Sequence, residues 1–133
     1  TDRFVFDAGD YVLKVPNGSG VDHMREEILN WEFAPDDLRQ WLAPVHDYAD
    51  DGVWLLMEYA QQVPNYRTGR EVAQDVTAGI RRAGYDAIDM GRNNTGTIDG
   101  DPVAIDYGYP LSPEDSYRLG PRPEEFFDPL EEP

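Results

Sequence analysis

The stretch 89–108 carries the side chains of this chain with the clearest potential for chemistry. Asp89 stands five residues before Asn94, and a second carboxylate, Asp106, follows a short apolar run. Between them Asp99-Gly100 predicts a tight hairpin, because both residues tolerate the backbone that such a turn requires. Carboxylate and amide oxygens suit magnesium, and a further carboxylate can orient or deprotonate a hydroxyl. Phosphoryl transfer from a nucleotide needs groups of these three kinds.

The charge balance of the chain is strongly acidic. Its 133 residues suffice for one domain with a core, and 27 acidic residues against 11 basic ones give a formal net charge of −16. Lys14 is the only lysine among the basic residues. Such a composition is typical of proteins kept soluble in molar salt, where the screening length falls to about 3 Å at 1 M. The alternative is an ordinary acidic domain.

Composition also excludes several classes of protein. No basic patch is visible in the sequence, which disfavours nucleic acid as a partner. No apolar run is long enough to cross a bilayer and no secretory leader is recognised, so we expect no membrane association. The chain has no cysteine, which excludes disulfides and thiolate metal sites.

The elements upstream must position these groups, and the first are two strands at residues 3–7 and 11–15. A strand repeat of two residues places Val12 and Lys14 on one face. In a chain that avoids lysine, Lys14 is a candidate for a role that arginine cannot fill. The alternative is a chance surface lysine.

A helix is predicted from a cap at Asp22 to about residue 31. Glu27 shares its apolar face with Met24, Ile28 and Trp31, whereas Glu26 is expected to point away. A carboxylate on a buried face needs a cation, and Lys14 is the natural partner. We therefore favour Glu27 over Glu26 as the residue that pairs with Lys14.

The middle of the chain predicts further strands and helices. A short helix at 35–42 and a strand at 43–48 precede the most apolar run, 53–60, which is expected to be a central strand. Thr68 and Glu71 form a capping box, which predicts a second long helix ending near residue 84. His23 and His46 lack metal-ligand spacing, and we expect both at the surface.

The order of these features resembles the protein-kinase-like superfamily, and most closely the small truncated kinase-like proteins of tailed phages and haloarchaeal viruses. The motifs Asp89-x4-Asn94 and Ile105-Asp106-Tyr107-Gly108 carry this resemblance. It implies an α+β, minimal two-lobed kinase-like fold, in which an antiparallel sheet with one helix precedes a helix and the catalytic hairpin. The C-terminal helical subdomain would be missing. The fold would occupy residues 1–110, and 111–133 would form an acidic, proline-rich tail.

The resemblance also implies ATP and Mg²⁺ as cofactors and assigns roles to single residues. Asp89 would act on the acceptor, and Asn94 and Asp106 would bind the metal. Lys14 would contact the phosphates and Glu27 would hold Lys14 in place. Glu58 and Ala60, at the end of the run 53–60, would belong to the hinge whose backbone binds adenine.

Two functions follow from this resemblance. The intact set of polar residues favours an ATP- and Mg²⁺-dependent phosphotransferase of a halophilic virus or its host. Three departures favour a catalytically inactive pseudokinase: no glycine-rich loop precedes Lys14, Ile88 stands directly before Asp89, and the C-terminal helices are missing. Such a protein would serve as a binding or structural module, with a nucleotide and a protein or virion component as partners. It would lie in the cytoplasm of a high-salt host or in the virion.

Overall fold

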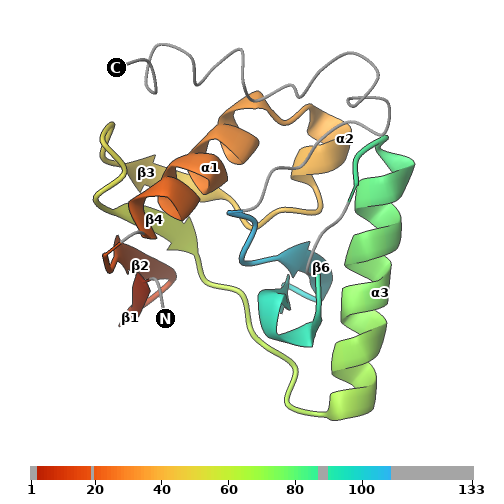
Figure 1. The fold of residues 1–133 in the computed structure, drawn as a ribbon. Helices are drawn as coiled ribbons and strands as arrows, with labels where there is room; N and C mark the ends of the chain where they lie inside the picture. The colour runs from red at the N-terminus through yellow and green to blue at the C-terminus, as the bar shows by residue number, and fades with distance from the viewer. Residues whose placement is uncertain (1–2, 19, 87–89, 109–133) are drawn as a thin grey trace.

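The computed structural model describes residues 3–18, 20–86 and 90–108, which form a mixed α+β architecture (Figure 1). An antiparallel sheet has the strand order β1-β2-β4-β3, and a separate hairpin joins β5 to β6. The elements run in the order β1 (Arg3–Ala8), β2 (Tyr11–Pro16), α1 (Gly20–Phe33), α2 (Asp36–Arg39), β3 (Val45–Tyr48), β4 (Leu55–Glu58), α3 (Tyr66–Arg82), the 3-10 turn η1 (Arg92–Asn94), β5 (Thr95–Ile98) and β6 (Asp101–Ala104).

The register of the large sheet decides which side chains share a face. Val5 of β1 lies opposite Lys14 of β2, and Lys14 lies opposite Leu55 of β4. Residues directly opposite each other on paired strands point to the same side of a sheet, and so do residues two apart on one strand. Arg3 and Val12 therefore share a face with Val5, Lys14 and Leu55, which we call the inner face. The prediction of a central strand is confirmed, because β4 pairs with β2 on one side and β3 on the other.

Helix α1 covers the inner face of the sheet (Figure 1). It begins at Gly20 rather than at Asp22, which lies in the first turn and does not cap the helix. The expectation that Glu26 faces solvent is wrong, since it is buried along with Glu27. Residues 105–108 contact α1 on this side, because the side chain of Asn30, one turn after Glu26, donates to the carbonyl of Tyr107. This contact with a segment distant in sequence extends the buried surface of the helix beyond its apolar stripe.

Helix α3 packs against the hairpin. The capping box predicted at Thr68 is wrong, because the helix begins two residues earlier and the side chain of Asn65 accepts from the amides of Arg67 and Thr68. The backbone N–H groups in the first turn of a helix have no acceptor within the helix, and an asparagine side chain accepts from them as well as a threonine side chain would. Val76 and Ile80, which are spaced four residues apart along this helix, are fully buried.

The hairpin has the predicted Asp99-Gly100 tip, with φ of 51° and 84° at the two residues. Positive φ at both positions is typical of a type I′ turn, which matches the twist of the strands. Ala43 and Trp41 exchange backbone hydrogen bonds with Ala104, and Gln61 does so with Thr97. These bonds join the hairpin to the segments before β3 and after β4. The residues between α2 and β3 thus pair with the hairpin, so the helix predicted at 35–42 and the strand predicted at 43–48 are both shorter in the structure, at Asp36–Arg39 and Val45–Tyr48.

The buried apolar side chains form one cluster that spans the sheet, α1, α3 and the hairpin, including Met24, Leu42, Leu55, Met57, Val76, Ile80 and Tyr107. The shared core makes the described segments a single packed unit. No helix among the described residues is long and apolar enough to span a membrane. The tail predicted at 111–133 lies outside the described residues.

Candidate functional site

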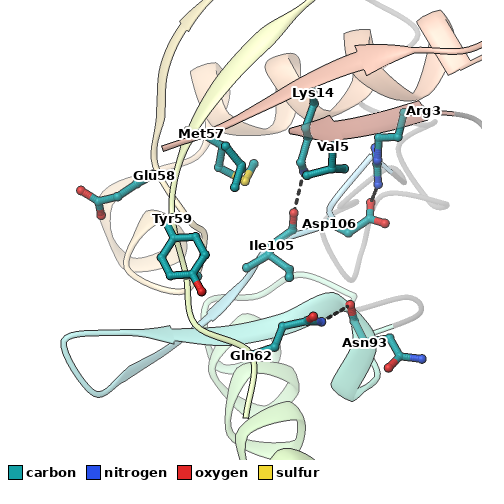
Figure 2. A pocket seen from close by; sticks show the side chains of 12 residues that line it. Arg3, Val5, Lys14, Met57, Glu58, Tyr59, Gln62, Asn93, Ile105 and Asp106 are labelled. Carbon is teal, nitrogen blue, oxygen red and sulfur yellow. Dashed lines mark hydrogen bonds and ion pairs between the residues drawn. The ribbon is translucent and has the colours of Figure 1, made fainter. Parts of the chain in front are cut away.

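A cavity of about 470 Å³ lies between the inner face of the large sheet and the hairpin (Figure 2). Its walls come from β1, β2, the end of β4 with the residues that follow it, and the segments at 93 and 105–106. The lining residues are Arg3, Val5, Val12, Lys14, Met57, Glu58, Tyr59, Ala60, Gln62, Asn93, Ile105 and Asp106. Most of the lining is apolar, and charged groups gather at the end formed by β1 and β2 (Figure 2).

Lys14 is held at that end by two contacts. Its ammonium group lies 2.8 Å from Oε1 of Glu27 and donates to the carbonyl of Ile105 at 2.6 Å. Lys14 is 4% exposed and Glu27 is 0% exposed. The predicted pairing of Lys14 with Glu27 is confirmed, and the preference for Glu27 over Glu26 is supported by this contact. The role of the pair in binding phosphates stays a prediction.

Glu27 also fixes the chain that follows β6. Its second oxygen accepts from the amide of Tyr107 at 2.7 Å, so one buried carboxylate connects β2 to the segment that carries Asp106. The ring of Tyr107 is fully buried and its hydroxyl donates to the carbonyl of Ala43 at 2.6 Å. Burial, reinforced by the charge of Glu27, raises the pKa of Tyr107 well above its usual value. The sequence pattern indicated no role for Tyr107 beyond its place in the motif, and its contacts show that it anchors the segment 105–108.

Asp106 forms an ion pair with Arg3 of β1, and Figure 2 shows both side chains inside the cavity. Burial alone would raise the pKa of Asp106. The hydrogen bond and charge of Arg3, with smaller contributions from Lys14 and the amide of Gly108, outweigh burial and hold this pKa below its ordinary value. Sequence reasoning missed Arg3. The available signal was strand parity, because Arg3 stands two residues from Val5, which lies opposite Lys14.

The donors expected to bind magnesium lie close along the backbone. The carbonyl of Asn94 accepts from the amide of Ile105 at 2.9 Å, so the hairpin brings Asn94 beside the residue before Asp106. Asn93 rather than Asn94 lines the cavity. Within residues 3–18, 20–86 and 90–108, no cluster of three or more His, Cys, Asp or Glu side chains is found.

These residues fit magnesium poorly in the arrangement observed, because one of the two expected ligands, Asp106, is paired with a cation. Magnesium needs carboxylate or amide oxygens that are free to coordinate it. The carboxylate of Asp106 instead meets the guanidinium of Arg3. Asp89, expected to act on the acceptor, lies outside the described residues.

The edge of the cavity opposite the charged end is formed by residues 57–62. Glu58, the last residue of β4, and Ala60 line the cavity, and their part in binding adenine stays a prediction. The carboxylate of Glu58 points away from it (Figure 2) and lies 3.7 Å from Nε2 of His46. Glu58 therefore contributes backbone and not charge to the site. His46 is partly exposed, in line with its expected place at the surface.

No family model, curated protein or solved structure matches this chain. The cavity itself offers an apolar wall, a backbone edge at 57–60, and the cations Arg3 and Lys14 at the far end.

Proposed function

We propose that this chain is a kinase-like protein that binds ATP in the cavity between the sheet and the hairpin. The observation that carries the proposal is the buried ion pair of Lys14 and Glu27, 2.8 Å apart, at the end of an apolar cavity. Lys14 lies on a strand, Glu27 on the helix that covers it, and the segment 105–108 closes the site. This is the arrangement by which kinase-like sites present a lysine to nucleotide phosphates.

The lining offers each part of a nucleotide a suitable surface. Val5, Val12 and Met57 form apolar walls for a base, and the backbone at 58–60 borders the same space. Lys14 lies at the other end, and its contacts with Glu27 and Ile105 fix the ammonium group before a ligand arrives. A preorganised cation favours phosphate binding because no side chain has to be ordered on binding.

An active phosphotransferase would need more than this binding site. Asp89 would have to orient the acceptor hydroxyl, and Asn94 with Asp106 would have to bind Mg²⁺. The magnesium ion would supply charge stabilisation to the phosphates. Asp106 would first have to leave Arg3, since its carboxylate is already paired.

A catalytically inactive binding module is the second candidate, and the Arg3–Asp106 ion pair favours it over the active enzyme. The guanidinium meets the carboxylate that an enzyme would present to the metal. In this form the protein would use nucleotide binding, or the kinase-like shape alone, to contact a protein or virion component. A high-salt host is the setting that the acidic composition favours.

The test is a titration of the full chain with ATP in molar salt, with and without Mg²⁺, followed by thermal shift. We expect ATP to raise the melting temperature of the wild type and Lys14→Met to abolish the increase. Arg67→Met is the matched control, because Arg67 is a solvent-exposed cation outside the cavity. The absence of any ATP effect on a well-folded wild type would overturn the proposal.

Turnover separates the two candidates. Transfer of the γ-phosphate by the wild type, lost in Asp89→Ala with ATP binding retained, would support the phosphotransferase. Binding without transfer in both proteins would support the binding module.

A further inference from the structure

The cavity contains two buried cations that reach it from neighbouring strands. The side chains of Arg3 and Lys14 are 9% and 5% exposed, and both line the cavity. They share the inner face of the sheet, because Val5, two residues from Arg3, lies directly opposite Lys14. Figure 2 shows the two side chains descending from these strands toward the segment 105–106.

Each cation has its own carboxylate. Glu27 compensates Lys14 and Asp106 compensates Arg3, so the buried charges are paired before any ligand enters. Arg3 lines the cavity, and its planar guanidinium matches the oxygens of a phosphate as well as those of a carboxylate. Arg3 is therefore placed to meet the phosphate oxygens of a ligand that enters the cavity.

We propose that Arg3 takes the place of the metal in this site, so that Arg3 and Lys14 together bind nucleotide phosphates without magnesium. This inference rests on the proposed function and identifies the form of its ligand: a metal-free nucleotide. The observation behind it is the mismatch between the expected magnesium donors and the ion pair that one of them forms with Arg3.

Electrostatics oppose a divalent cation at this position. A magnesium ion bound to Asp106 would lie beside the fixed positive charge of Arg3, with Lys14 on the neighbouring strand. Like charges at short range in a partly buried site repel strongly, and magnesium gives up its hydration water reluctantly. Direct contacts from a preordered guanidinium avoid both costs.

The experiment compares ATP affinity in buffer containing Mg²⁺ with affinity in buffer containing EDTA, measured calorimetrically in molar salt. Wild type is expected to bind equally in both, within about twofold. Arg3→Met should weaken binding in EDTA by about tenfold or more, because a charge-assisted contact to phosphate is lost. The same variant should regain affinity when Mg²⁺ is added, since Asp106 is then free to bind it. Arg67→Met, which also removes one arginine, should behave as wild type.

A second measurement uses the metal alone. Mn²⁺ binding, followed by electron paramagnetic resonance, should be absent at this site in the wild type and appear in Arg3→Met. The gain should be lost again when Asp106→Asn is added to Arg3→Met. Arg3→Lys keeps the charge without the fork, so it should stay independent of magnesium but bind ATP more weakly than wild type. If Arg3→Met does not fold, the ATP affinities of Arg3→Lys and of the wild type, each measured in Mg²⁺ and in EDTA, decide whether phosphate binding needs the metal.

The outcomes separate this inference from the proposed function. ATP binding by wild type that requires Mg²⁺ would overturn the inference and leave the proposed function standing. Equal ATP binding by wild type and Arg3→Met in EDTA would also overturn it, showing that the ion pair only attaches β1 to the rest of the fold. No binding by wild type in either buffer would overturn the proposed function itself.

Discussion

The ammonium group of Lys14 and the carboxylate of Glu27 lie 2.8 Å apart in the interior of the protein, and both are satisfied by further contacts. Lys14 also donates to Ile105, and Glu27 also accepts from Tyr107. The pair therefore joins β2, α1 and the segment after β6. Because it connects elements far apart in sequence, the same contact that shapes the cavity should also stabilise the fold.

Removing either partner should cost a large part of the free energy of unfolding. Lys14→Met leaves the carboxylate of Glu27 buried without a cation, and we expect a loss of about 3–5 kcal/mol. Glu27→Gln keeps an acceptor for Tyr107 but leaves the lysine charge unpaired, so it should also be strongly destabilising. The double variant should lose less than the sum, with a coupling of about 1–3 kcal/mol. Denaturant unfolding at constant salt measures all four proteins, and additive losses would show that the pair contributes nothing as a pair.

The Arg3–Asp106 ion pair should make stability depend on pH in the acid range. The pKa of Asp106 is lower in the folded protein than in the unfolded chain, so the unfolded state binds its proton more readily. The stabilisation is therefore present above about pH 4, the ordinary carboxyl value, and is lost as pH falls through the lower folded pKa. Asp106→Asn should be less stable than wild type at neutral pH and approach it in acid. A difference that stays constant from neutral to strongly acid pH would contradict this assignment.

Helix α3 should not tolerate a methyl group at Gly79. Alanine raises intrinsic helix stability by about 1 kcal/mol over glycine. A Cβ at Gly79, however, would lie 2.1 Å from Cε2 of Trp41, so the rigid ring would have to move. Gly79→Ala should lower the melting temperature. Gly69→Ala is the control on the same helix, because its nearest neighbour lies at 3.4 Å and the propensity gain should remain.

The fold should require salt. With a formal net charge of −16, carboxylates repel one another over the surface. Screening shortens from about 10 Å at 0.1 M to about 3 Å at 1 M salt, which reduces this repulsion. We expect a clear rise in melting temperature across that range, whether the salt is sodium or potassium chloride. A melting temperature independent of salt would favour the ordinary acidic domain instead.

The sequence alone determined the elements whose signals are local. Periods of two and of 3.6 residues identified the strands and both long helices, and Asp99-Gly100 identified the hairpin turn. Helical spacing also placed Glu27 on the face that meets Lys14, because residues at i+3 and i+4 share a face whatever the helix packs against. Helix starts were predicted less well, since Asn65 and Gly20 compete with other plausible starting residues nearby.

The tertiary structure decided which distant groups meet in the cavity. Arg3 reaches Asp106 only because β1 pairs with β2 in one particular register and the chain after β6 crosses beneath them. Tyr107 spans from Glu27 to Ala43 for the same reason. These contacts join residues 64 to about 100 positions apart, and no local pattern encodes such pairings. Spacing can propose a carboxylate as a metal ligand, but the cation that meets it is fixed by the packing of the whole chain.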